Sequence, residues 1–98
     1  MSFIDEYDFD ILKNESEILV LEELGRQLAE FKKPICRCNT CVLDIAAMAL
    51  NSVKPKYHVS LLGTQYASQA MNEPSYAVSL KNAVSAAIDK IRKNPAHD

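Results

Sequence analysis

Three cysteines, Cys36, Cys38 and Cys41, form a C-x-C-x-x-C run just before a helical pattern. Thiolates are good zinc ligands, and a turn that leads into a helix can direct several of them at one ion. Three cysteines leave a tetrahedral site one protein ligand short. His58, His97 and a partner subunit are the candidates for the fourth position. The run therefore favours a structural zinc site, with free or redox-active thiols and another metal as the alternatives.

Side chains that suit a nucleotide follow the cysteine run. They are Asp44, Asn51, Lys54, Lys56 and Tyr57. Lysines can hold phosphate groups, an aromatic ring can stack on a base, and a carboxylate or an amide can read the edge of a base. The alternative is that Asp44 bonds to Arg37 or to a neighbouring backbone group, while Asn51 only caps its helix. Spacing alone leaves both interpretations open.

The charge is distributed unevenly along the chain, although the net charge is only −2. Residues 1–31 hold nine acidic and two basic residues, whereas residues 32–58 hold five basic residues and one acidic residue. A local basic patch on an acidic protein suits a small anion better than a DNA backbone, which generally requires a broad basic face. Arg37 belongs to this patch and is a further candidate for binding the ligand. The alternative is that these cations merely solvate a loop.

No pattern typical of a catalytic site is present. The sequence lacks a Ser/His/Asp set, a glycine-rich phosphate loop, and the H-E-x-x-H or H-x-E patterns of catalytic zinc sites. We therefore expect a binding protein and not an enzyme. No apolar run approaches the roughly 20 residues needed to span a bilayer, and the acidic N-terminus lacks the basic region of a signal peptide. With an odd number of cysteines, these features predict a cytoplasmic protein.

The first clear helix is predicted from about residue 15 to residue 32. Asn14 and Glu17 have the spacing of a capping box, and Pro34 marks the end of the helix. An apolar stripe recurs at helical spacing and consists of Leu21, Leu24, Leu28 and Phe31, widened by Ile18 and Val20. The stripe is interpreted either as the core of a monomer or as a seam shared in a dimer.

Two further helices are predicted on the C-terminal side. One begins at Asn39 or Thr40, either of which can cap it, and runs to about residue 52. It is apolar nearly all round, which is typical of a helix in the middle of a bundle. The other begins near Pro74. Its apolar face carries Ala77, Leu80, Val84, Ala87, Ile88 and Ile91.

The composition favours a single all-α domain. A chain of 98 residues makes one domain, and only two glycines among abundant helix-forming residues favour helices. A short extended segment is expected at residues 57–63 and a short helix at residues 64–71. We therefore expect a small helical bundle of about four helices over residues 14–95. An acidic N-terminal arm, residues 1–13, precedes it as a docking arm or as a frayed lead-in.

A long motif resembles a known family. It reads Asn14-x-x-Glu17-x-x-Val20-x-x-Glu23, then Cys36-x-Cys38-x-x-Cys41-x-x-Asp44-Ile45-x-Ala47-x-Ala49-Leu50-Asn51-x-x-x-Pro55-x-Tyr57, then Gly63. Over about residues 14–93 the chain resembles the late competence development protein ComFB family. The resemblance implies an intertwined all-α homodimer, structural zinc on the cysteine run, and binding of cyclic dinucleotides. The ligand motif carries over at Asp44, Asn51, Pro55 and Tyr57, and more loosely at Lys56.

Two departures from the family pattern concern these sites. Many members have Pro-Pro where this chain has Lys54-Pro55, and some have a distant C-terminal cysteine that is absent here. The expected function is a cytoplasmic, dimeric receptor for a cyclic dinucleotide, above all cyclic di-GMP, which signals to a downstream protein in competence or motility. The alternative is a zinc-stapled adaptor that binds no nucleotide. No DNA, RNA or membrane partner is expected.

Overall fold

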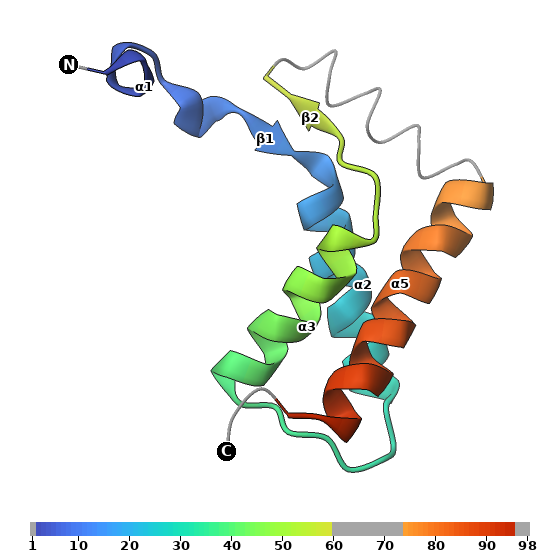
Figure 1. The fold of residues 1–98 in the computed structure, drawn as a ribbon. Helices are drawn as coiled ribbons and strands as arrows, with labels where there is room; N and C mark the ends of the chain where they lie inside the picture. The colour runs from blue at the N-terminus through green and yellow to red at the C-terminus, as the bar shows by residue number, and fades with distance from the viewer. Residues whose placement is uncertain (1, 60–73, 96–98) are drawn as a thin grey trace.

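The computed structural model describes residues 2–59 and 74–95. In chain order the described elements are α1 (Phe3–Glu6), the 3-10 helix η1 (Phe9–Ile11), β1 (Lys13–Asn14), α2 (Glu15–Glu30), α3 (Asn39–Asn51), β2 (Tyr57–His58) and α5 (Pro74–Lys93). The three long helices pack together, whereas the chain before β1 extends away from them (Figure 1). This arrangement confirms the predicted small all-α bundle. The short helix predicted at residues 64–71 lies outside the described residues.

Helix α2 begins where the sequence predicted and ends earlier. The Oδ1 atom of Asn14 caps the helix by accepting the backbone N–H of Ser16 at 3.2 Å. The last helical residue is Glu30, two residues before the predicted end. Nη2 of Arg37 donates to the carbonyl of Leu28 at 2.8 Å. The same carbonyl also accepts the backbone N–H of Phe31, the C-cap, at 3.3 Å, so Arg37 is its second donor at the end of the helix.

The core face of α2 differs from the predicted stripe. The apolar residues of α2 and its C-cap that pack in or against the core are Leu19, Val20, Leu24, Leu28 and Phe31. Ile18 and Leu21, by contrast, are 47% and 46% exposed. Within one chain these two residues therefore do not face the core, which contradicts the interpretation of the whole stripe as the core of a monomer. The interpretation as a seam shared in a dimer stays a prediction. The buried residues of α2 follow four-residue steps along one side of the helix, at Ser16, Val20 and Leu24. Ile18 and Leu21 lie off that line.

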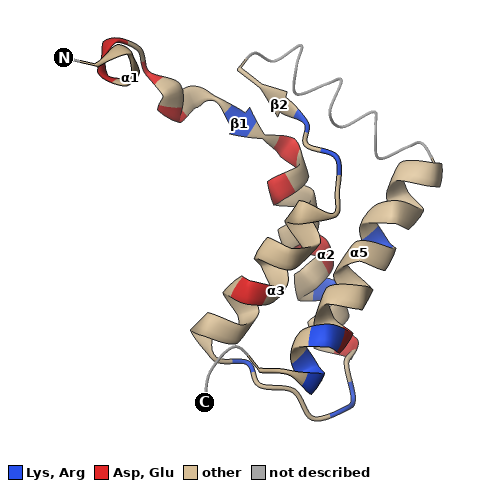
Figure 2. Ribbon diagram, viewed as in Figure 1, with Lys and Arg blue, Asp and Glu red and all other residues tan. Residues whose placement is uncertain are grey.

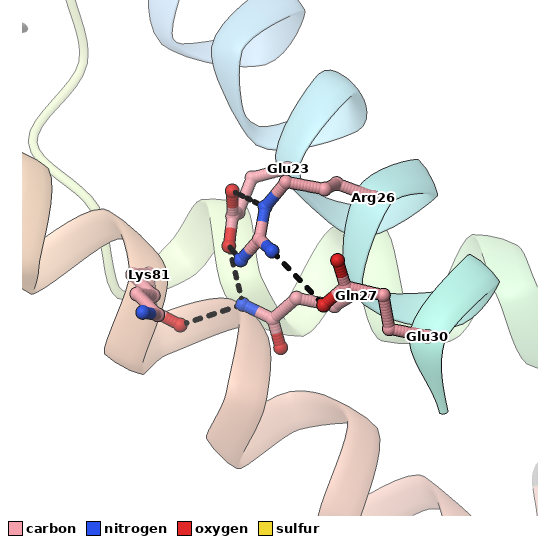
Figure 3. Close-up of polar contacts among 5 residues, drawn as sticks. All are labelled: Glu23, Arg26, Gln27, Glu30 and Lys81. Carbon is pink, nitrogen blue, oxygen red and sulfur yellow. Dashed lines mark hydrogen bonds and ion pairs between the residues drawn. The ribbon is translucent and has the colours of Figure 1, made fainter. Parts of the chain in front are cut away.

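A polar cluster ties the outer side of α2 to α5 (Figure 3). Arg26 donates to the two carboxylate oxygens of Glu23, at 2.9 Å from Nε and 2.6 Å from Nη2, and to Glu30 at 3.2 Å. Gln27 donates to Glu23 at 2.7 Å and to the backbone carbonyl of Lys81 at 3.1 Å. The hydrogen bond from Arg26 lowers the pKa of Glu23 below its ordinary value, although burial acts in the opposite direction.

Acid should weaken the bundle in part through Glu23. Because its pKa is lower in the folded state than the ordinary value of 4.5, its stabilising contribution is present above that value and is lost as the pH falls through the folded pKa. The variant Glu23→Gln should therefore be less stable than the wild type near neutral pH, and the difference should shrink at acidic pH. Urea unfolding at both pH values checks this, and a difference that does not change with pH would contradict it.

Helix α3 spans the predicted residues, but its cap differs from the prediction. The N-cap is Cys38, whose Sγ accepts the backbone N–H of Cys41 at 3.4 Å. Asn39 and Thr40, the predicted caps, lie inside the helix. Cysteine is not among the side chains that usually cap helices. The sequence pattern therefore indicated Asn39 or Thr40, although Cys38 is the cap. The first turn of α3 is thus bonded to the cysteine run itself.

One side of α3 is open, in contrast to the prediction of a helix buried all round. Its buried residues are Cys41, Ile45, Ala46 and Ala49. Leu43 is 59% exposed and lines a hollow on the outer side together with Thr40, Asp44 and Ala47. We call these four residues the outer face of α3. An exposed apolar stripe on an otherwise apolar helix is typical of a surface that binds another chain.

Helix α5 completes the core as predicted. Its buried residues are Leu80, Val84, Ala87, Ile88 and Ile91. They pack against α2 and α3, and α3 makes the most extensive contact with α5. Burial of a large aliphatic side chain contributes about 1.5–3 kcal/mol, so this face holds the three helices together. Within residues 2–59 and 74–95, no helix combines the length and the apolar character that crossing a membrane requires.

A short antiparallel pairing joins the start of α2 to the segment that follows α3. Lys13 in β1 pairs with His58 in β2, and Asn14 pairs with Tyr57. The two strands hold the beginning of α2 beside the end of α3 (Figure 1). Because each strand has only two residues, no alternating pattern in the sequence could indicate the pairing.

Candidate functional site

The three cysteines meet at the N-terminal end of α3. The Sγ atoms of Cys36, Cys38 and Cys41 all lie within 4.8 Å of one another. In a tetrahedral site with zinc–sulfur bonds of about 2.3 Å, the sulfur atoms are about 3.8 Å apart. Shifts of about 1 Å would therefore let the three sulfur atoms share one ion. Cys41 is buried, Cys36 is partly buried and Cys38 is exposed, so such an ion would lie at the edge of the core.

His58 does not belong to this cluster. It lies in β2, beyond the opposite end of α3, where its Nε2 is 3.1 Å from a carboxylate oxygen of Glu15. The 13 residues of α3 span about 20 Å. His58 therefore cannot complete the site of its own chain, which corrects one of the candidates for the fourth ligand. The second candidate, His97, lies outside the described residues, and a partner subunit remains the third.

At the other end of α3, residues 54–58 are fixed to α2 by hydrogen bonds. We call these residues the ligand loop. The Oδ1 atom of Asn14 accepts the backbone N–H of Lys56 at 2.7 Å in addition to capping α2. The backbone N–H of Glu15 donates to the carbonyl of Lys56 at 2.8 Å. The loop that carries most of the candidate ligand residues therefore has a fixed backbone.

Ser16 connects the ligand loop to α5. It is fully buried, its Oγ donates to the carbonyl of Lys54 at 2.7 Å, and it lies 2.6 Å from the hydroxyl of Tyr76. A serine hydroxyl carries one proton, so the hydroxyl of Tyr76 donates to Ser16. Sequence reasoning missed both residues, which are 60 positions apart. The one available signal was a serine placed four residues before Val20 on the buried side of α2.

Removing the hydroxyl of Ser16 should destabilise the protein. The variant Ser16→Ala leaves the carbonyl of Lys54 and the hydroxyl of Tyr76 without this partner in a partly buried place, which should cost about 1–3 kcal/mol. Tyr76→Phe is the matched variant, because it removes one of the two bonds and keeps the ring, and it should cost less than Ser16→Ala. Urea unfolding measures both. Equal stability of Ser16→Ala and the wild type would contradict the role of this hydroxyl.

The two lysines of the ligand loop have different surroundings. The Nζ atom of Lys56 lies 5.1 Å from the centroid of the Tyr76 ring, a distance at which a cation is attracted to an aromatic face. Lys54 is exposed. Tyr76 is therefore connected to the loop in two ways, directly by Lys56 and indirectly by Ser16, which bonds to Lys54. One lysine is directed at α5, and the other extends into solvent.

Tyr57 presents its ring to solvent. The residue is 62% exposed and lines a hollow with the start of α2 and the residues before it. The other residues of this hollow are Leu12, Lys13, Asn14, Glu17 and Ile18. An exposed ring on a fixed backbone is suited to stacking on a flat ligand. The hollow adds Lys13 to the positive groups near the loop, whereas Glu17 opposes an anion there.

Asp44 and Asn51 both lie on exposed positions of α3. They are seven residues apart, about 10 Å along the helix axis. Arg37 is not the partner of Asp44, because its guanidinium binds the carbonyl of Leu28. Asn51 is not the cap of α3, because Ser52 takes that position. Neither an ion pair with Arg37 nor the cap position of α3 thus accounts for these two residues, and both are exposed.

Arg37 is separated from the ligand loop. It precedes α3, whereas Asn51 ends it, about 20 Å away along the axis. Figure 2 shows basic residues near β2 and a second group at the loop between α2 and α3 and the last turns of α5. The basic patch predicted over residues 32–58 is therefore divided between the two ends of α3. Within one chain, Arg37 cannot bind the same small ligand as Tyr57.

Comparisons with known proteins agree with this fold. The sequence profile of the family described as late competence development protein ComFB matches residues 13–95. A solved structure titled "Structural characterization of the late competence protein ComFB from Bacillus subtilis" is similar, with a TM-score of 0.72 and 22% sequence identity. The similarity covers 87% of this chain and 92% of that chain. A search of curated proteins gives no match. The family match begins at β1, so residues 2–12 lie outside it.

Proposed function

We infer the function from one premise, which is that this chain belongs to the late competence development protein ComFB family. We propose that it is a cytoplasmic receptor for a cyclic dinucleotide, above all cyclic di-GMP, and that it acts as a dimer without catalysing a reaction. The ligand loop is the observation that carries the proposal. There, an exposed aromatic ring and two lysines lie on a backbone held by Asn14 and Ser16.

Each group of the loop suits one part of such a ligand. The ring of Tyr57 can stack on a base, which contributes about 1–3 kcal/mol per base. Lys54 and Lys56 can neutralise phosphate groups, and Lys56 would exchange its contact with the ring of Tyr76 for an anion. The amide of Asn51 offers both a donor and an acceptor to the edge of a base. Pro55 restricts the backbone between the two lysines.

A dimer would give the ligand two equivalent loops. Cyclic di-GMP has two identical halves, and an interface between two copies related by a two-fold axis presents the same residues twice. The outer face of α3 is the surface that we propose for this interface. Its open side carries Leu43 and Ala47 and has Asp44 as its single charged residue. A second copy would bury the apolar residues and place two Asp44 side chains beside the shared ligand.

Zinc is the cofactor proposed for the cysteine cluster. Three thiolates within 4.8 Å of one another fit a zinc ion. The ion would supply no chemistry for a reaction. It would hold the chain before α3 against the first turn of that helix. The fourth ligand would come from a partner subunit, from His97 or from solvent.

An adaptor without a nucleotide ligand is the competing function. In that case the zinc cluster would stabilise the fold, and the acidic residues of the first third of the chain would bind a partner protein. The exposed chain before β1, with no buried residue in α1 or η1, favours this candidate. The two functions differ in one measurable property, which is the affinity for a cyclic dinucleotide.

Calorimetric titration with cyclic di-GMP distinguishes them. We expect saturable binding at micromolar or lower ligand concentration and a rise in melting temperature. The stoichiometry should be one ligand per dimer, with the dimer established by sedimentation. A ligand at 100 times its dissociation constant stabilises the folded state by about 2.7 kcal/mol. Cyclic di-AMP and GTP serve as comparison ligands. Absence of both heat and thermal shift at high micromolar cyclic di-GMP would favour the adaptor.

A further inference from the structure

Residues 2–12 of the N-terminal arm present an apolar surface that no other part of residues 13–59 and 74–95 buries. Six of its large apolar side chains are at least 45% exposed, namely Phe3, Ile4, Tyr7, Phe9, Ile11 and Leu12. Five of them, together with Asp8 and with Val59 from the segment after β2, line a hollow of about 460 Å³. An apolar surface of this kind on a folded protein is typical of a binding site for another molecule.

Three aromatic rings shape this surface. The ring centroids of Phe3, Tyr7 and Phe9 lie 5.1, 5.9 and 6.1 Å from one another. These distances are those of rings in mutual contact, so the cluster has no room for a ligand between its rings. Among the described residues, the outer faces of these rings are exposed. Aromatic faces attract cations, and arginine most often.

The charge of the arm points to the same kind of partner. Residues 2–12 contain Asp5, Glu6, Asp8 and Asp10 and no lysine or arginine. Carboxylates beside aromatic rings therefore attract a segment that carries arginine or lysine next to apolar residues. The hollow would take an apolar side chain of that segment, and the carboxylates would pair with its cations.

The same charges exclude two other occupants. In a two-fold contact between two copies, the same patch lies on both sides, so two such arms would bring eight carboxylates together without a cation. Anionic membrane surfaces would likewise repel the arm. The arm also lies outside the residues that match the family, whereas the outer face of α3, with one charge, is inside them.

We propose that the N-terminal arm, residues 2–12 together with Val59, is a docking surface for a basic, apolar segment of a different protein. Through this surface the chain would contact the protein that it regulates. The proposal does not depend on nucleotide binding, because the arm contains none of the residues assigned to the ligand. Its test therefore uses the full-length protein without nucleotide, and its failure is separate from failure of the proposed receptor function.

The test measures fluorescence anisotropy of two short labelled peptides. One peptide consists of leucine and arginine at helical spacing, and the other has glutamine in place of arginine. We expect the arginine peptide to bind the wild type at least about tenfold more tightly than the glutamine peptide, and to weaken as salt rises from about 50 to about 300 mM. The double variant Phe3→Ser/Phe9→Ser should weaken binding about tenfold or more.

Two further variants separate the arm from the rest of the surface. Asp8→Asn/Asp10→Asn should weaken binding of the arginine peptide and reduce its salt dependence. Val78→Ser removes an apolar side chain on α5 that is 56% exposed, and it should bind like the wild type. Melting temperatures of the arm variants should equal that of the wild type, because no residue of α1 or η1 is buried.

Three results would overturn the proposal. The first is equal affinity of the wild type for both peptides, or equal affinity of Phe3→Ser/Phe9→Ser and the wild type for the arginine peptide. The second is a change from dimer to monomer in sedimentation of that double variant, which would make a second copy the occupant. The third is binding of the wild type to phosphatidylglycerol vesicles that the double variant loses, which would make a membrane the occupant.

Discussion

Removing zinc from the site that we propose at the cysteine cluster should lower the melting temperature of this protein by roughly 10–25 °C, which corresponds to about 3 kcal/mol for a domain of this size. Structural zinc contributes about 10 kcal/mol or more in small peptides that fold only around the ion. Here α2, α3 and α5 also share a core, so part of the fold should survive. The loss should arise where the chain enters α3, because the three sulfur atoms gather there.

Cys38→Ser isolates the role of the metal. Cys38 is exposed, and its side chain caps α3. Serine is a good N-cap, so this variant removes a proposed metal ligand while it keeps the cap and leaves no cavity. It should contain less zinc than the wild type, melt at the temperature of the chelated wild type, and show no further change when a chelator is added. Cys41→Ser is less informative, because it also places a hydroxyl in the core.

Alkylation distinguishes the zinc site from a redox site. With zinc bound, the three thiolates should react slowly with iodoacetamide until a chelator is added. Fast reaction of exposed Cys38 in the untreated protein, together with an unchanged melting temperature after chelation, would show that the cysteines are free thiols. That result would contradict the proposed structural zinc site and would favour a redox role for the cysteines.

The parts of the fold that follow from local pattern were predictable. Helix α5 was predicted with its buried face, because its apolar residues recur at helical spacing and Pro74 marks its start. Asn14 was recognised as a cap because its type is usual there. Cys38 was not recognised, because a thiol rarely caps a helix. This cap also places the side chain of Cys38 beside Cys41, where a shared metal site requires it.

Contacts between distant parts of the chain were not predictable. Ser16 meets Tyr76 across 60 positions, and β1 meets β2 through two residues of each strand. These contacts decide where the ligand loop lies, yet a single sequence contains no periodicity that indicates them. The same limit explains the error over Arg37. Charge counted along the chain placed it with Lys54 and Lys56, whereas the length of α3 separates them.

Exposure of apolar residues also escaped the sequence pattern. Leu21 and Leu43 look like core residues by type, but they are 46% and 59% exposed. An apolar residue that meets a second chain has the same pattern as one that meets its own core. Telling core residues from residues that meet a second chain therefore required the position of each helix. In the structure, the outer face of α3 and the N-terminal arm are two separate exposed surfaces that differ in charge.

Truncating Tyr57 to alanine should weaken the binding of cyclic di-GMP by about 5- to 150-fold, the range expected for loss of about 1–3 kcal/mol of stacking. The residue is 62% exposed, and its pairing with Asn14 in the two strands uses backbone groups. The melting temperature without ligand should therefore stay near that of the wild type. Tyr57→Phe keeps the stacking face and should bind within a few-fold of the wild type.

The matched control is Tyr7→Ala, because Tyr7 is 60% exposed and lies outside both the ligand loop and the family match. Its nucleotide affinity should be unchanged, whereas Asn51→Ala should weaken binding by removing contacts to the base edge. Lys54→Gln should reduce affinity and also its dependence on salt, because Lys54 would act through charge. If calorimetry finds the same affinity in Tyr57→Ala, Asn51→Ala and the wild type, any nucleotide site must lie elsewhere on the protein.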